Sequence, residues 1–458
     1  MEETRKNDFT KGSVAKVILK MALPLAVAQL VNVLYNIVDR IYIGQMPDVG
    51  STALTGLGLA MPIITAVSAF ANLCGHGGAP LCSIARGKGD TDEAQKIMGN
   101  AFSLLLIFGV AAMALCLAFK KPILYMLGAS DATYVYANEY ATIYLLGTIF
   151  VMITLGMNSF INSQGFARTG MFTVVIGAVM NIVLDPIFIY ALDMGVKGAA
   201  LATVLSQLIS AVWVLCFLTG KKAILRLDLK SMRLQAKRVG RILSLGTTGF
   251  VMAFTNSIVQ AVTNAVLAQY GGDLYIGAMT VINSIREILV LPLRGLTQGA
   301  EPVIGYNYGA GAYKRVRASI KFMSLASIGY STVCWAVVML LPEPLMRIFN
   351  SDPELLAAGV PAARVFFCAV FLMALQFGGQ TAFLSLGKAK QAITFSVLRK
   401  VIIVVPLTIL LPMIPGVGVM GVFASEPASD ILGGFACYLT MFFTVYRPLK
   451  KLEDKTPA

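Results

Sequence analysis

A stripe of polar side chains crosses an otherwise apolar stretch of the chain, QLVNVLYNIVDRIYIG at residues 29–44. Its polar members recur at intervals of three and four residues: Gln29, Asn32, Asn36 and Asp39. A helix places residues at this spacing on one face. A carboxylate inside a membrane costs about 2.5–3.5 kcal/mol when it faces lipid, so we expect Asp39 to face protein or water. An acid there that a proton or a metal cation can neutralise is suited to ion coupling, and pairing with the adjacent arginine is the alternative.

A second polar group follows in two later apolar segments. In MNIVLDPIFIY, Asn181 and Asp185 are four residues apart and share a helix face, and Pro186 removes a backbone hydrogen bond beside the acid. In the next segment Thr203 and Gln207 are also four residues apart. Three helices can therefore bring two carboxylates, an amide and a hydroxyl together. Oxygen groups of this kind suit a hard cation, and two close carboxylates tend to hold one proton. Packing of helices through polar hydrogen bonds is the alternative.

The composition indicates a helical membrane protein. Hydrophobic residues make up 57% of the chain and charged residues only 13%, and the mean hydropathy is +0.76. Apolar runs of roughly 20 residues, the length that spans a bilayer as a helix, recur along the whole sequence. We predict an all-α membrane protein with twelve transmembrane helices. Their approximate limits are 17–43, 53–78, 97–119, 134–160, 169–190, 195–219, 240–269, 275–300, 315–341, 356–385, 391–413 and 418–446.

The basic residues predict the orientation of the chain in the membrane. The formal net charge is +14, and Lys and Arg gather in alternate loops: the N-terminal tail, 86–96, 221–241, 314–321, 388–390 and the C-terminal tail. Since basic loops stay on the cytoplasmic side, we expect both termini to be cytoplasmic. This topology accounts for the charge, so we expect contacts with membrane lipids and no nucleic-acid partner.

The two halves of the sequence repeat each other. The turn around Pro80, GGAPLCSIARGKG, is echoed around Pro302, and the motif SQG at 163–165 is echoed by SLG at 385–387. Both pairs are separated by 222 positions (302 − 80 and 387 − 165). Two six-helix lobes with the same orientation imply a pseudo-two-fold axis along the membrane normal.

The repeat also sets the expected domain boundaries. These are a cytoplasmic tail at 1–16, an N-lobe at 17–219, a cytoplasmic linker at 220–239, a C-lobe at 240–446 and a cytoplasmic tail at 447–458. Leucines alternate with charges in the linker, and we expect it to form an amphipathic helix on the membrane surface.

The polar site is not duplicated. Asp39 aligns with Thr263, and the Asn–Asp pair aligns with valines in KVIIVVPLTI, where only the proline is kept. The C-lobe has acids of its own, Glu426 and Asp430, for which an ion role, a substrate role and simple pairing all stay open.

Several motifs together resemble one family. Twelve spans in two like halves, ALPLAVAQLVNVLYNIVDRIYIG, GGAPLCSIARGKGD, MNIVLDPIFIY and the NYGAG turn resemble the multidrug and toxic compound extrusion (MATE) transporters, most closely the bacterial DinF/MepA-like branch. The resemblance covers essentially the whole chain. It implies an antiporter of the bacterial inner (cytoplasmic) membrane that exports organic, often cationic, compounds in exchange for inward protons or sodium ions by alternating access. It also implies a cation site, sodium-binding if sodium is the coupling ion, and no cofactor. The residues of that site are Asp39, Asn181, Asp185 and Thr203.

The resemblance places the substrate in a cleft between the lobes. Met and aromatic side chains give an adaptable apolar wall, and a buried acid such as Glu287 attracts a cationic drug. A structural ion pair of Glu287 with Arg286 or Arg294 is the alternative. The candidate cleft residues are Tyr35, Asn36, Met61, Asn158, Asn256, Gln260, Met279, Asn283 and Glu287.

Other classes of protein are less well supported. A flippase for lipids or lipid-linked precursors would have a strongly basic central cavity, whereas the intramembrane arginines are few, chiefly Arg286, Arg294 and Arg364. A channel or receptor would not need an asymmetric cation site. We expect no enzyme activity, because no nucleophile, metal or phosphate-loop motif is present. The expected partners are drug-like small molecules, and the expected state is a monomer.

Overall fold

The computed structural model describes residues 7–47 and 50–453, and within them every regular element is helical. Eleven helices of this described part are long and apolar enough to cross a membrane, and one bent pair of helices makes a twelfth span. The twelve predicted spans are therefore confirmed. Several limits agree closely, since the predicted 169–190 and 195–219 correspond to Ala167–Ala191 and Gly195–Thr219.

One predicted span is wrong in shape. The segment 134–160 is not one helix but two, α4 (Asp131–Leu146) and α5 (Thr148–Ser163), which meet at an angle of 59°. Gly147 joins them, and a Cβ atom there would lie 2.5 Å from Cγ2 of Val204 on the neighbouring helix. The bend therefore depends on a residue without a side chain, where the chain packs closely on α7 (Gly195–Thr219).

The described chain divides into two compact units. Unit 1 comprises residues 7–8 and 27–249, and unit 2 comprises residues 9–26 and 250–453. The boundaries lie inside α1 (Val14–Gly44) and α8 (Ala236–Tyr270), so each of these helices belongs partly to both units. In unit 2, a Cβ atom on Gly299 would lie 2.6 Å from the backbone of Ala22, so the start of α1 packs directly on the glycine face of α9.

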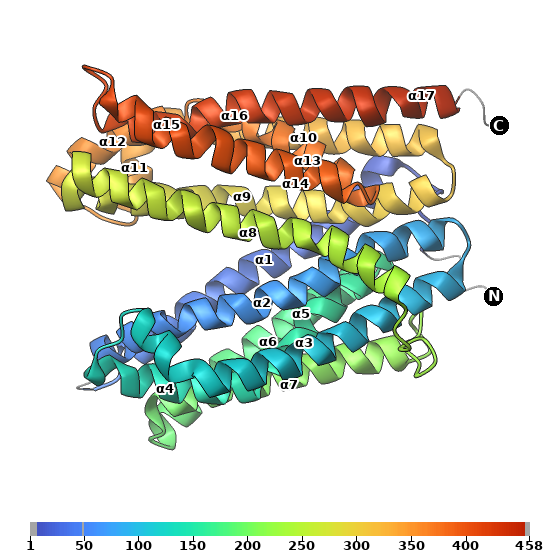
Figure 1. The fold of residues 1–458 in the computed structure, drawn as a ribbon, viewed down its shortest axis with the longest axis horizontal. Coiled ribbons are helices and arrows are strands. Elements are labelled where there is room, and N and C mark those ends of the chain that lie inside the picture. Colours follow the sequence, from blue (N-terminus) through green and yellow to red (C-terminus); the bar gives the residue numbers. More distant parts are fainter. Residues whose placement is uncertain (1–6, 48–49, 454–458) are drawn as a thin grey trace. The chain divides into compact units, whose positions relative to one another are not determined.

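The long helices of each unit run roughly side by side (Figure 1). Unit 1 continues after α1 with α2 (Gly50–Gly87), α3 (Thr91–Met126), α4, α5, α6 (Ala167–Pro186), the π-helical η2 (Ile187–Ala191) and α7. Unit 2 continues after α8 with α9 (Gly272–Gly309), α10 (Tyr313–Leu340), α11 (Pro342–Arg347), α12 (Pro353–Phe367), η3 (Val370–Leu372), α13 (Met373–Ser385), α14 (Ala389–Val397), η4 (Leu398–Val404), α15 (Val405–Leu410), η5 (Leu411–Met413), α16 (Met420–Met441), η6 (Phe442–Tyr446) and α17 (Arg447–Glu453). The equivalent helices α2 and α9 both have 38 residues, as the internal repeat predicts.

The outer surfaces of the units are apolar. On α1, for example, Leu23, Leu30, Leu34, Ile37 and Ile41 are exposed, although they are large hydrophobic residues. In a water-soluble protein such a continuous face would be buried, whereas lipid accepts it. The exposed apolar face therefore fits a helix that contacts lipid along its length.

The linker does not form the expected amphipathic helix. Residues 220–235 form turns and irregular structure, and helix α8 begins only at Ala236. Leu225 and Leu227 are buried while Arg226 and Asp228 are exposed, which is the alternation of an extended chain that packs against unit 1. The carbonyl Oε1 of Gln164 accepts a hydrogen bond from the Leu225 backbone N–H (2.8 Å). Fixed contacts with helices of unit 1 therefore replace the expected contact with the membrane surface.

Two π-helical turns lie next to the equivalent prolines of the two units, but on opposite sides of them. In unit 1, η2 follows Pro186, and in unit 2, η4 ends two residues before Pro406. A proline has no backbone N–H to donate, so it removes one hydrogen bond from the regular helical pattern. Irregular turns of this kind often accompany functional sites, and here each lies beside buried polar residues.

Candidate ion and substrate sites

Four polar side chains that the sequence predicted to form a site come together inside unit 1. Nδ2 of Asn181 donates hydrogen bonds to Oδ1 of Asp185 (3.2 Å) and to Oγ1 of Thr203 (3.4 Å). The carboxyl groups of Asp39 and Asp185 lie close enough to share a hydrogen bond. All four side chains are buried, with exposed fractions of 8% or less. Helices α1, α6 and α7 therefore position two carboxylates, an amide and a hydroxyl as one group.

This group has spare capacity to bind a positive ion. Among the described residues, no hydrogen-bond partner is found for three of its buried oxygens: Oδ1 of Asp39, Oδ1 of Asn181 and Oδ2 of Asp185. Buried polar atoms without partners are rare and call for an explanation. A proton shared by the two carboxylates, or a sodium ion held by the oxygens, satisfies them. The donor set therefore fits either coupling ion.

A cavity of about 240 Å³ in unit 1 adjoins these residues. Asp39, Asn181 and Thr203 line it, together with three predicted substrate residues, Tyr35, Asn36 and Met61. Asn36 turns back onto its own helix, where its Nδ2 donates to the carbonyl oxygen of Asn32 (2.6 Å). Ion and substrate candidates thus share one space in unit 1.

Asn158, a predicted substrate residue, does not line this cavity. Its Nδ2 donates to the carbonyl oxygen of Gly170 (3.2 Å), so the side chain links α5 to α6. Sequence reasoning missed Tyr140 and Tyr144, which line the cavity from α4 and whose rings stack with centroids 6.3 Å apart. Their spacing of four residues in an apolar segment was the available signal.

The remaining substrate candidates lie together in unit 2. Asn256, Gln260, Met279, Asn283 and Glu287 all line a cavity of about 270 Å³. Amide and carboxylate side chains therefore face this space, with Met279 supplying an apolar surface. Apart from Asn158, the candidates are divided between these two cavities, one in each unit.

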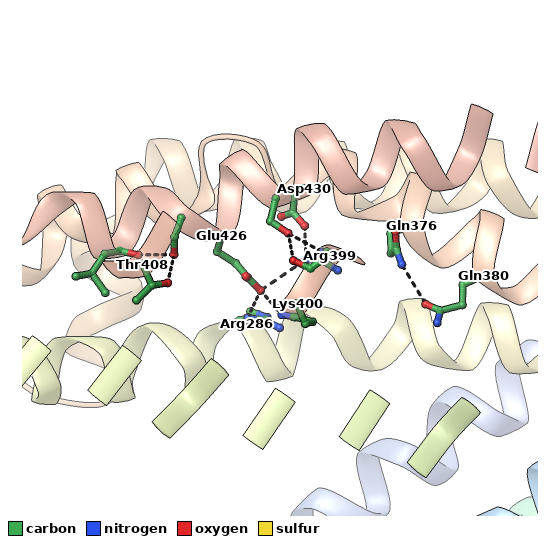
Figure 2. A network of polar contacts seen from close by, with 11 residues as sticks. Arg286, Gln376, Gln380, Arg399, Lys400, Thr408, Glu426 and Asp430 are labelled. Atoms are coloured by element: carbon green, nitrogen blue, oxygen red, sulfur yellow. Dashed lines mark hydrogen bonds and ion pairs between the residues drawn. The ribbon is translucent and has the colours of Figure 1, made fainter. Parts of the chain in front are cut away.

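A network of buried charges borders the unit 2 cavity (Figure 2). Arg399 pairs with Asp430, and Nζ of Lys400 donates to Oε1 of Glu426 (2.7 Å). Nη1 of Arg286 donates to the same Oε1 (2.9 Å). Glu426 and Asp430, for which several roles were open, are therefore members of ion pairs.

The sequence-based inventory of intramembrane basic residues was incomplete. It omitted Arg399 and Lys400, which lie in η4 and are buried. Lys400 opens the stretch KVIIVVPLTI, in which valines stand where the other half has the Asn–Asp pair, and Arg399 directly precedes it. The ion pair that was the alternative role for Glu287 is partly observed. Nη1 of Arg294 lies 3.5 Å from Oε2 of Glu287, whereas Arg286 pairs with Glu426.

Taken together, twelve apolar spans in two repeated units and a buried group of oxygen-bearing side chains in unit 1 are the architecture of a membrane transporter. Comparison with known proteins agrees. The sequence profile of the MatE family matches residues 24–187 and 248–410, well over half of the chain, so the protein belongs to the MatE family.

Individual relatives support the same assignment. Multidrug export protein MepA of Staphylococcus haemolyticus is 25% identical over 431 residues, which are 94% of each chain, and confirms the resemblance to MepA-like proteins. A crystal structure of MATE in the bent conformation has a TM-score of 0.91 at 22% identity and covers 98% of this chain and 99% of that chain. An outward-facing multidrug resistance MATE family transporter of the MOP superfamily has a TM-score of 0.89 at 22% identity and covers 97% of this chain and 98% of that chain.

Proposed function

We propose that the protein is a secondary active antiporter that exports organic, drug-like compounds in exchange for inward protons or sodium ions by alternating access. Membership of the MatE family and the likeness to a multidrug export protein support this function. Ion coupling is inferred from one observation, a buried polar group in which several oxygens have no hydrogen-bond partner in the described chain. The group consists of Asp39, Asn181, Asp185 and Thr203. We further propose that it works as a monomer in a bacterial cytoplasmic membrane, with both termini on the cytoplasmic side.

Competition in the unit 1 cavity explains how ion and substrate exchange. Asp39 lines the same cavity as Tyr35 and Met61. A compound bound there and a cation on Asp39 disfavour each other, and such coupling amounts to about 1–3 kcal/mol and is reciprocal. An inward cation supplies about 2.3 kcal/mol per charge for each 100 mV of membrane potential. Binding of the cation therefore favours release of the compound.

Prolines within the helices provide places for bending. Pro24 lies in α1, Pro62 in α2 and Pro302 in α9, and each removes one backbone hydrogen bond from its helix. Pro186 and Pro406 lie beside the two π-helical turns. We propose that alternating access uses these positions.

Efflux from proteoliposomes tests the proposal. The purified protein is reconstituted with rhodamine 6G inside the vesicles, and a sodium gradient or a proton gradient is imposed separately. We expect one or both gradients to drive dye efflux, and the gradient that does so identifies the coupling ion. Failure of both gradients to move this and other organic dyes would contradict the proposal.

The variant Asp39→Asn tests the ion site within the same assay. Asparagine has nearly the same shape as aspartate but cannot take up a proton or attract a sodium ion by charge. We therefore expect a folded protein whose dye efflux falls to that of vesicles without protein. The matched control is Glu343→Gln, which removes an exposed acid paired with Arg347 and should leave efflux unchanged. Full efflux by Asp39→Asn at equal protein content would exclude Asp39 as the coupling acid.

A further inference from the structure

The buried network of unit 2 contains more positive than negative charge. Three cations, Arg286, Arg399 and Lys400, share two carboxylates, those of Glu426 and Asp430. Asp430 pairs with Arg399, so a single oxygen of Glu426 receives both Lys400 (2.7 Å) and Arg286 (2.9 Å). A basic group inside a membrane is costly unless it is paired. One positive charge of this network therefore has no carboxylate of its own.

The excess charge faces open space. A second cavity of unit 2, of about 130 Å³, is lined by Arg286, Arg294, Arg399 and Lys400, and Glu287 is the one acid among its lining residues. It shares Arg286, Arg294 and Lys400 with the larger cavity of about 270 Å³. The carboxylates of Glu426 and Asp430 neutralise two of these four cations and Glu287 a third, so one net positive charge remains beside this space, and it favours an anion.

The other walls of the cavity suit the rest of an amphipathic compound. Met252, Met373 and Phe377 supply an adaptable apolar surface. Oε1 of Gln376 is buried, and no hydrogen-bond partner for it is found in the described part of the chain, while its Nε2 donates to Gln380 (3.3 Å). That oxygen is available to a hydroxyl or N–H group of a ligand.

We propose that this cavity of unit 2 binds the anionic group, a carboxylate or a phosphate, of an amphipathic ligand, with Lys400 and Arg286 as its direct contacts. The ligand class thus extends the proposed export function to anionic or zwitterionic compounds, and only the step from binding to export rests on that function. A basic fork of Arg and Lys beside an apolar wall recognises carboxylate and phosphate alike. The group can belong to a soluble compound or to a lipid head group.

Two dyes with one ring system and opposite charge test the proposal. Fluorescein is anionic and rhodamine 6G is cationic, and both share the xanthene ring. Binding to the full-length protein in a neutral detergent is followed by fluorescence polarisation. We expect saturable fluorescein binding that weakens about tenfold or more in Lys400→Gln, because one charge-assisted hydrogen bond is lost. Rhodamine 6G binding should not weaken in this variant.

Two matched variants should change the affinity for fluorescein in opposite directions. Glu287→Gln removes the lone acid from the cavity lining and should tighten fluorescein binding, whereas Arg294→Gln should weaken it. Lys400→Gln leaves Glu426 paired with Arg286, and Arg294 is exposed, so at least one basic variant stays folded. Arg347→Gln is the neutral control, because Arg347 forms an exposed ion pair with Glu343 outside the cavity. Unchanged fluorescein binding in both basic variants, or equal loss of rhodamine 6G binding, overturns the proposal.

Nanodiscs separate the two sources of the anion. Fluorescein binding is compared in nanodiscs of phosphatidylcholine with and without phosphatidylglycerol. If phosphatidylglycerol displaces fluorescein, the cavity binds a lipid head group. If phosphatidylglycerol leaves fluorescein bound, the cavity binds a soluble anion. Binding in detergent needs no ion gradient. Fluorescein binding without gradient-driven efflux therefore contradicts only the export function, and cation efflux without fluorescein binding contradicts only the anion site.

Discussion

Asn181 donates two hydrogen bonds from its amide group to residues of the proposed ion site, one to Asp185 on the next turn of α6 and one to Thr203 on α7. Because Nδ2 is held by these two acceptors, the orientation of the amide is fixed and its Oδ1 is left without a protein partner in the described chain. The side chain therefore acts as a positioning residue that links α6 to α7 and leaves its own Oδ1 available to a ligand.

The hydroxyl of Thr203 should contribute to ion affinity. Thr203→Val keeps the shape of the side chain but removes the acceptor for Asn181, so the amide loses one of the bonds that orient it. A net hydrogen bond is worth about 0.5–1.5 kcal/mol, and we expect the ion concentration for half-maximal efflux to rise about two- to tenfold. Thr203→Ser keeps the hydroxyl and should behave like the unchanged protein. An unchanged half-maximal concentration in Thr203→Val would show that the hydroxyl has no part in ion binding.

The ion pair of Arg399 and Asp430 should matter for stability. Asp430→Asn leaves the buried guanidinium without its main partner, and breaking a buried pair in this way costs about 3–5 kcal/mol. Thermal unfolding in detergent should show a clear fall in melting temperature. The double variant Arg399→Met with Asp430→Asn removes the unpaired charge as well and should recover most of the loss. A double variant less stable than Asp430→Asn alone contradicts this account.

Close packing of α8 on α2 should depend on one glycine. A Cβ atom on Gly246 would lie 1.8 Å from the carbonyl oxygen of Leu73, whereas a Cβ atom on Gly249 would meet nothing within 4 Å. We expect Gly246→Ala to destabilise the protein by about 1–3 kcal/mol through overpacking. Gly249→Ala, one turn further on, should be neutral or slightly stabilising, because alanine favours a helix. Equal melting temperatures of the two variants would argue against close contact of these helices.

Asn100 should hold the linker in place. Its Nδ2 donates to the carbonyl oxygens of Ser231 (3.1 Å) and Arg233 (3.0 Å), and its Oδ1 accepts from the Gln235 N–H (2.9 Å). Asn100→Ala removes all three bonds, so we expect faster trypsin cleavage at the basic residues of the linker. Gln95→Ala removes a single exposed bond to Asp228 and is the control. Equal cleavage rates for Asn100→Ala and the unchanged protein would show that other contacts fix this segment.

Helical spacing was sufficient to predict much of this molecule. The spans could be predicted from the apolar runs, because the thickness of the bilayer sets the length of helix that crosses it. Asn181 and Asp185 were recognised as one helix face because their spacing and the neighbouring proline are local properties of the sequence.

Features that depend on contacts between distant segments were not predictable in this way. Arg399 and Lys400 lie inside the predicted span 391–413, but only the π-helical turn η4 and helix α16 show that they meet Glu426. Gly147 is one glycine among many, and only the structure shows that Val204 packs closely against it at the bend. The linker leucines repeat every second residue, which is the period of an extended chain, and the amphipathic interpretation gave this period too little weight.

The division of α1 and α8 between the units has a consequence for synthesis of the protein on the ribosome. Residues 9–26 leave the ribosome early, yet they belong to unit 2, whose other residues begin at 250. Unit 1 in turn includes residues up to 249, beyond its own last long helix α7. Neither unit is complete when the linker emerges. Each unit therefore needs a segment from the other half of the chain, and fragments cut at 220–235 would each lack a segment that lies in the other fragment.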